Sequence, residues 1–144
     1  MQPRSLFAIF ACMLILATAI PQAASAGDFK YMTPDQVKEM IDSKTPMHIV
    51  DIQVEEEFDD HHLADAMATY SYPVKSQEDT DKIDVIIDEL KADTTPVVVV
   101  CPRGKGGAER CYNYLAKQGV EEERIFILEG GQGGWPFDDY VESK

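Results

Sequence analysis

The chain has 144 residues, and its 26 acidic and 13 basic side chains give it a formal net charge of −13 at pH 7. So acidic a chain repels nucleic acid and anionic membranes, and we expect neither as a partner. Its length suits one compact domain with one hydrophobic core, since no linker, repeat or low-complexity tract divides it.

The first 26 residues have the pattern of a secretory signal peptide. Arg4 is followed by an apolar run from Leu6 to Ile20 and then by the small residues Ala24–Ala26. The run is shorter than the about 20 residues that span a bilayer, and no second long apolar stretch follows it. We therefore expect residues 1–26 to be removed and residues 27–144 to form the domain. The mature protein is then periplasmic or secreted, without stable membrane association.

A lipid anchor is the alternative interpretation of this segment. Cys12 follows Ile9-Phe10-Ala11, which faintly resembles a lipoprotein site. Lipidation there would leave the apolar residues 13–20 on the mature chain, so the signal peptide is favoured.

The first half of the domain alternates between helical and extended patterns. Thr33-Pro34-Asp35-Gln36 combines a capping residue, a proline at the first helical position and a glutamine placed for a capping box, which predicts a helix start. The pattern then predicts a strand at His48–Ile52, a brief helix at Glu55–Asp60 and an extended piece at Ser71–Val74. Between residues 80 and 90, isoleucine and leucine recur at the spacing of one helical face.

The second half contains the strand that we expect at the centre of the sheet. Pro96–Val100 is β-branched on both faces, as a parallel strand buried on two sides requires. A glycine-rich loop follows, then a helix that ends at Gly119, and then a strand at Arg124–Leu128. This alternation predicts an α/β domain, with a mostly parallel sheet of about five strands flanked by helices on both faces.

The strongest chemical signal is the loop that follows this central strand. Cys101 lies at the strand's carboxyl end, where open α/β sheets place their ligand sites. The six residues after it combine backbone freedom with positive charge: Pro102, Arg103, Gly104, Lys105, Gly106 and Gly107. Glycines let successive N–H groups point inward as an anion-binding nest, and the following helix adds the positive end of its dipole. These features favour a thiolate, so we predict that Cys101 is a nucleophile rather than an inert strand-end thiol.

Three motifs, in order along the chain, resemble the rhodanese family. Residues 101–106 match its six-residue active loop, with glycine at the fourth place. Residues 51–66 resemble its N-terminal signature, in which five residues fall on expected positions: Asp51, Glu57, Phe58, His62 and Ala66. Ile127–Gly131 with Trp135 is similar to its C-terminal signature.

The resemblance implies a rhodanese-like domain that transfers sulfane sulfur. The Cys101 thiolate would take sulfur from thiosulfate, a polysulfide or a persulfide, and pass it to cyanide or a thiol. Pro102–Gly107 would bind the small anionic donor, while Asp51, Glu57 and His62 would support the site. No cofactor and no metal are implied. The alternative is a module of the same shape that carries or senses sulfur, or binds a partner, without turnover.

The chain also departs from the family pattern. Many members carry arginine at the place of Gly106 and at the place of Gln53, and glycine at the places of His61 and Asp65. Without an arginine at position 106, Arg103 or Lys105 and the loop amides would have to bind the donor anion. The second leaves Glu57 without its usual partner.

A related class of phosphatases is the nearest competing interpretation. These enzymes bind phosphate with a cysteine, five intervening residues and an arginine. In this chain that place is Gly107, and the next arginine is Arg110, inside the predicted helix. Without the bidentate clamp of an arginine, phosphate chemistry is disfavoured.

Two smaller features have competing interpretations. Cys111 lies on the predicted core stripe, so a buried apolar role is favoured over a structural disulfide or a resolving thiol for Cys101. The run Asp59–His62 could suggest a metal site, but adjacent residues do not point to a common centre.

Overall fold

The computed structural model describes residues 28–144, so the predicted signal peptide lies outside the described residues. The domain is built on a five-stranded sheet in the order β1-β6-β5-β2-β4, and every neighbouring pair of strands in it is parallel. The strands are β1 (Tyr31–Met32), β2 (His48–Asp51), β4 (Met67–Ala68), β5 (Val97–Val100) and β6 (Ile125–Leu128). A small antiparallel ribbon joins β3 (His62–Leu63) to β7 (Val141–Glu142).

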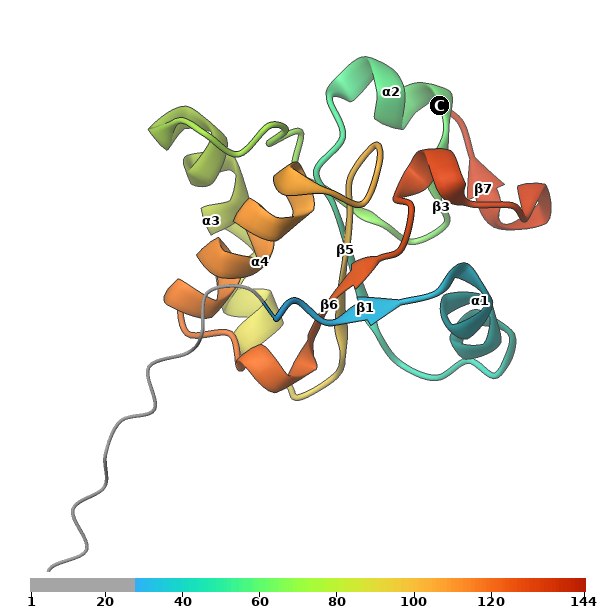
Figure 1. Ribbon diagram of the computed structural model, residues 1–144, viewed down its shortest axis with the longest axis horizontal. Helices are drawn as coiled ribbons and strands as arrows, with labels where there is room; N and C mark the ends of the chain where they lie inside the picture. Colours follow the sequence, from blue (N-terminus) through green and yellow to red (C-terminus); the bar gives the residue numbers. More distant parts are fainter. Residues whose placement is uncertain (1–27) are drawn as a thin grey trace, which may run out of the picture.

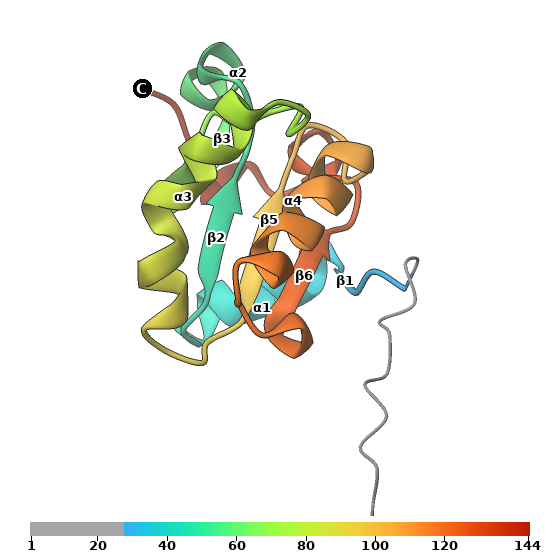
Figure 2. The same cartoon turned by 90° about the vertical axis from the view of Figure 1, so that its left-hand side faces the viewer.

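Helices cover both faces of the sheet, as predicted. They are α1 (Pro34–Asp42), α2 (Glu55–Asp60), α3 (Gln77–Lys91) and α4 (Gly106–Lys117), with short 3-10 turns at Glu122–Arg124, Gln132–Gly134 and Asp138–Tyr140. Figure 1 shows α3 and α4 on one side of the sheet and α1 on the other. In Figure 2 the same two helices lie in front of the strands, and α2 lies beyond the end toward which the strands run.

Local sequence accounts for where the longer helices begin. Thr33 accepts a hydrogen bond from the Gln36 N–H, and the Gln36 side chain accepts one from the Thr33 N–H, so the predicted capping box is present. Ser76 and Asp79 form a second capping box, which starts α3 earlier than the apolar spacing indicated.

The valines of β5 divide the core into two layers. Val97 and Val99 pack with α3 and α4, whereas Val98 and Val100 pack on the α1 side with Leu63. All four valines are fully buried, because β5 is the middle strand and lies under helices on both faces.

The extended piece predicted at Ser71–Val74 is wrong. The fifth strand is Met67–Ala68, while Tyr72 and Pro73 lie in a turn and Val74 has a φ of +58°. The strands β1, β3, β4 and β7 have two residues each, too few for a period to stand out in the sequence.

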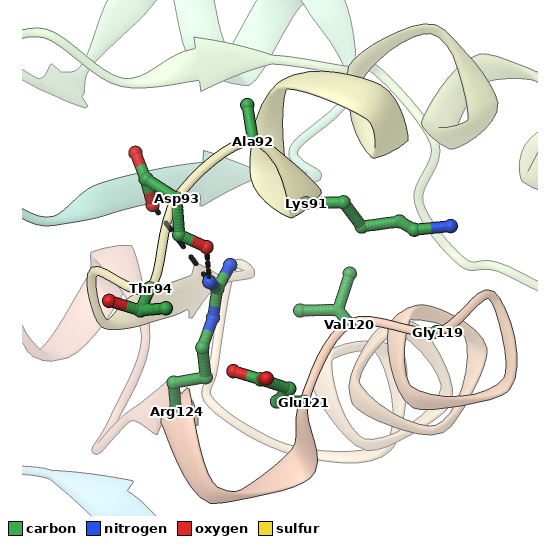
Figure 3. A pocket seen from close by; sticks show the side chains of 8 residues that line it. All are labelled: Lys91, Ala92, Asp93, Thr94, Gly119, Val120, Glu121 and Arg124. Carbon is green, nitrogen blue, oxygen red and sulfur yellow. Dashed lines mark hydrogen bonds and ion pairs between the residues drawn. The ribbon is translucent and has the colours of Figure 1, made fainter.

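A hollow of about 230 Å³ lies at the amino ends of β5 and β6, and Figure 3 shows its lining. Arg124, which is 8% exposed, donates hydrogen bonds there to the backbone carbonyls of Leu90 and Asp93. Its guanidinium also lies 3.9 Å from the Asp93 carboxylate. Since helices leave their last carbonyls unpaired, Arg124 caps the end of α3.

None of the helices within residues 28–144 is long and apolar enough to cross a membrane.

Candidate active site

Cys101 follows the last residue of β5 and is 2% exposed. The Gly104 N–H donates a hydrogen bond to its Sγ atom at 3.0 Å. A backbone donor aimed at sulfur stabilises negative charge there, whether on a thiolate or on a persulfide. The thiol thus lies in a loop whose backbone is already turned toward it.

Gly104 is required by the path of this loop. Its φ is +62°, a conformation that side chains disfavour. A Cβ atom at this position would lie 2.6 Å from the Leu128 carbonyl oxygen and 2.7 Å from the Gly131 nitrogen. Because both neighbours are backbone atoms, any side chain here must displace the loop from β6.

The C-terminal signature holds the Cys101 loop from the other side. The Gln132 N–H donates to the Cys101 carbonyl at 2.8 Å, and the Gly133 N–H donates to the Pro102 carbonyl at 3.0 Å. Gly131 has a φ of +61°, and a Cβ there would lie 2.1 Å from the Cys101 oxygen. The two motifs, separated by about 30 positions in the sequence, therefore form one bonded unit.

The residues predicted to bind substrate surround the start of α4. Arg103 and Lys105 are exposed, and neither side chain forms an ion pair with a residue in the described part of the chain. The first helical bond of this segment runs from the Glu109 N–H to the Lys105 carbonyl. The N–H groups of the preceding helical residues thus have no intrahelical acceptor, as at every helix start. These N–H groups, together with Arg103 and Lys105, give the loop a positive potential.

Two side chains lie beside this loop that the sequence did not predict there, Arg110 and Tyr72. The guanidinium of Arg110 lies 3.0 Å from where a Cβ on Gly106 would be, so a cation lies beside the place where many relatives carry arginine. Arg110 Nε donates to the Pro73 carbonyl at 2.9 Å, which holds the side chain on the flank of the helix. A Cβ on Gly107 would lie 2.7 Å from the Tyr72 ring, so tyrosine fills the space of the phosphatase arginine.

Asp51 is fully buried at the end of β2 beside Gln53. Its carboxyl accepts hydrogen bonds from the Gln53 backbone N–H at 2.8 Å and from the Gln53 side-chain amide at 3.0 Å. The amide also donates to the His61 carbonyl at 3.2 Å. Burial raises the pKa of Asp51 to about 6, and the hydrogen bonds from Gln53 only partly oppose this rise. A neutral amide thus occupies the place of the family's arginine without supplying its charge.

His62 supports the turn after α2. Its Nδ1–H donates to the Phe58 carbonyl at 2.6 Å, and its ring stacks on that of Phe58 with centroids 3.8 Å apart. Glu57, in contrast, is exposed, and its carboxylate has no hydrogen-bond or ion-pair partner within residues 28–144. Asp65 keeps a φ of +63°, so the backbone retains a conformation typical of glycine.

Cys111 is fully buried on the core side of α4, and burial raises the pKa of its thiol. Both cysteines of the described chain are free. Cys111 packs with Leu115 and Ile127 in the larger core cluster, in keeping with an apolar role. No group of three or more potential metal ligands gathers anywhere in residues 28–144.

Comparison with protein-family models gives a match to the rhodanese-like domain over residues 33–136. This span contains Cys101, its loop and both flanking signatures. Among curated protein sequences, none matches the chain significantly.

Solved structures share the fold at low sequence identity. A rhodanese-like domain protein from Staphylococcus aureus is 24% identical, with a TM-score of 0.57 over 81% of this chain and 99% of that one. A yeast protein tyrosine phosphatase of the rhodanese family is 16% identical, with a TM-score of 0.63 over 78% and 90%. An As-Sb reductase from Leishmania major is 16% identical, with a TM-score of 0.59 over 81% and 87%.

Proposed function

Because the chain belongs to the family of rhodanese-like domains, we propose that it is a sulfurtransferase that works through a persulfide on Cys101. The observation that carries this proposal is the Gly104 N–H bonded to the Cys101 Sγ at the carboxyl end of the central strand. The loop thereby offers a fixed hydrogen-bond donor to each anionic sulfur species that forms at Cys101 during the reaction.

In the first half-reaction the Cys101 thiolate attacks the outer sulfur of an anionic donor such as thiosulfate. A bond forms between Sγ and that sulfur, and the sulfur–sulfur bond of the donor breaks. Sulfite leaves with the electron pair, and the enzyme retains a persulfide anion. Arg103 and Lys105, two exposed residues of the loop, attract the doubly charged sulfur donor to an otherwise acidic protein.

In the second half-reaction a thiophilic acceptor removes the outer sulfur. Cyanide carbon or a thiolate sulfur attacks it, and the persulfide bond breaks. The electron pair returns to Cys101 Sγ, which the Gly104 N–H stabilises as a thiolate. The products are thiocyanate or a new persulfide, and the enzyme regains its starting state.

A phosphatase function has less support, although a structural neighbour is a protein tyrosine phosphatase of the rhodanese family. The Tyr72 ring occupies the space that a side chain at Gly107 would need. Arg110 bonds to the Pro73 carbonyl instead of entering the loop. The bidentate clamp for a phosphate dianion is thus missing.

We further propose that the protein is exported to the periplasm or secreted. The support is the arginine, apolar run and small residues of the first 26 positions. Fractionation of cells that express the full chain, followed by N-terminal sequencing of the product, tests this. A mature start near residue 27 is expected, and a cytoplasmic product that retains Met1 would contradict it.

Mass spectrometry and turnover measurements test the sulfurtransferase proposal. Exposure to thiosulfate should add one sulfur atom to Cys101, and cyanide or a thiol should remove it. With thiosulfate and cyanide together, thiocyanate should form over many cycles. A single stoichiometric burst would instead indicate the sulfur carrier without turnover.

The matched variants are Cys101→Ser and Cys111→Ser. The first should lose both sulfur loading and turnover, because a serine hydroxyl forms no persulfide. The second should keep both, since its thiol is buried in the core. Full activity in Cys101→Ser would overturn the proposal.

A further inference from the structure

A cleft of about 390 Å³ opens beside the Cys101 loop. It has three walls, formed by the α2 segment, the Cys101 loop and the C-terminal loop. Its lining consists of Gln53, Glu57, Asp60 and His61, then Pro102 and Arg103, and finally Gln132, Gly133 and Trp135. We call it the acceptor cleft. Pro102, which lines the cleft, follows Cys101 directly in the chain, so the cleft adjoins the loop that carries the proposed nucleophile.

The charges that line the acceptor cleft are opposite in sign and unpaired. Glu57 and Asp60 belong to the α2 wall, and Arg103 belongs to the loop wall. None of the three forms an ion pair with any residue in 28–144. The cleft thus has a negative wall and a positive wall, and the positive one is next to Cys101.

Gln132 provides a second, independent observation. The residue is 4% exposed, and its amide nitrogen donates to His61 Nδ1 at 2.7 Å. Its Oε1 atom is buried without a hydrogen-bond partner in the described chain. An unpartnered buried carbonyl is costly, and because Gln132 lines the cleft, a small movement of its side chain would expose Oε1 to an N–H donor of a bound ligand.

From these groups we infer that the acceptor cleft binds an aminothiol, a small thiol that carries a protonated amine. This inference rests on the proposed sulfur transfer and names its acceptor class. The thiolate end lies toward Arg103 on the Cys101 loop, and the ammonium lies toward Glu57 and Asp60 on the α2 wall. The buried Trp135 offers an apolar wall to the methylene groups between the two ends.

The transfer balances without another reactant. The aminothiol loses its thiol proton to water, and its sulfur attacks the outer sulfur of the persulfide. The bond between that sulfur and Cys101 Sγ breaks, and Sγ keeps the electron pair. The ammonium group stays protonated and leaves with the new persulfide.

Three acceptors of matched length test the inference with thiosulfate as donor. They are cysteamine, 2-mercaptoethanol and 3-mercaptopropionate, which end in an ammonium, a hydroxyl and a carboxylate. With rates corrected for the thiolate fraction of each, we expect kcat/KM to fall in that order, by about tenfold from the first to the last. The preference should shrink at high ionic strength, because salt screens exposed charges.

A double variant and a matched control locate the effect. Glu57→Gln with Asp60→Asn should abolish the preference for cysteamine over 3-mercaptopropionate. Asp88→Asn with Glu89→Gln removes the same charge from exposed positions on α3 and should leave the preference intact. A preference that both double variants retain, or that both lose equally, would overturn the inference.

The outcomes separate the inference from the function on which it rests. Turnover with cyanide but no preference for cysteamine in the wild type would refute the aminothiol and leave sulfur transfer standing. Failure of every acceptor, including cyanide, would refute the proposed function itself.

Discussion

The two ends of the sheet each contain a hollow with an arginine and two carboxylates, but they use these charges differently. At the amino end, Arg124 donates to two backbone carbonyls at the end of α3, and only its Nε lacks a partner in the described chain. At the carboxyl end, Arg103 lines a cleft with Glu57 and Asp60 and pairs with neither. Charges with filled hydrogen bonds stabilise the fold, whereas unpaired ones beside a nucleophile are available to a ligand.

Arg124→Met should have the largest effect on stability. It leaves the carbonyls of Leu90 and Asp93 buried without donors, which should lower the free energy of unfolding by about 3 kcal/mol. Urea unfolding measures this, with Glu121→Gln as a control from the same hollow that should change it by less than about 0.5 kcal/mol. Equal stabilities for the two variants would show that the amino-end hollow is not structural.

Gly104→Ala should have the next largest effect, this time on activity. The methyl group meets backbone atoms of Leu128 and Gly131, so the loop must shift and the Gly104 N–H moves away from Sγ. We expect kcat for thiocyanate formation to fall about 100-fold, the cost of losing one such donor. Gly106→Ala is the matched control, because its methyl meets only side-chain atoms of Arg110 and no backbone atom. A similar loss in both would argue against a specific role for the Gly104 N–H.

Asp51→Asn should reveal the cost of burying a carboxylate beside a neutral amide. Because burial raises the pKa of Asp51 from 3.8 to about 6, the folded state binds more protons than the unfolded state between these values. The stability contributed by Asp51 is therefore present at low pH and is lost as the pH rises through about 6. Because asparagine does not titrate, the variant should gain about 2 kcal/mol of stability relative to the wild type between pH 4 and pH 8. The acceptor that asparagine lacks toward Gln53 lowers its stability at both pH values and leaves this difference unchanged.

Gln53→Arg provides the companion measurement for Asp51. A guanidinium beside the carboxylate stabilises its charged form, so the pH dependence of unfolding should flatten. A stability difference between Asp51→Asn and the wild type that does not vary with pH would contradict the raised pKa.

Arg110→Gln should have the smallest effect. Its guanidinium lies beside Gly106, and its loss weakens the positive potential that attracts a dianionic donor. We expect KM for thiosulfate to rise about threefold at low salt, and the difference to vanish at high salt. An unchanged KM at low salt would show that Arg110 does not attract the sulfur donor and that Arg103 and Lys105 suffice.

Much of this molecule could be predicted from local pattern. The capping box at Thr33, the buried valines of β5 and the glycine-rich loop after Cys101 each depend on neighbouring residues, so their signals are visible in the sequence. The place of Cys101, the candidate nucleophile, at the carboxyl end of the central strand followed from the same pattern. Short strands such as Met67–Ala68 could not be predicted, because their backbone pairing arises from distant segments.

The sequence by itself determined the fold class, the order of the main elements and the identity of the candidate nucleophile. Only the tertiary structure decided which charges are paired and which are free. Arg124 and Arg103 are the same residue type in the same acidic chain, yet one caps a helix and the other lines the acceptor cleft. The physical reason is that electrostatic partnership depends on distance in space, and charges remote in sequence meet only when the sheet brings its loops together.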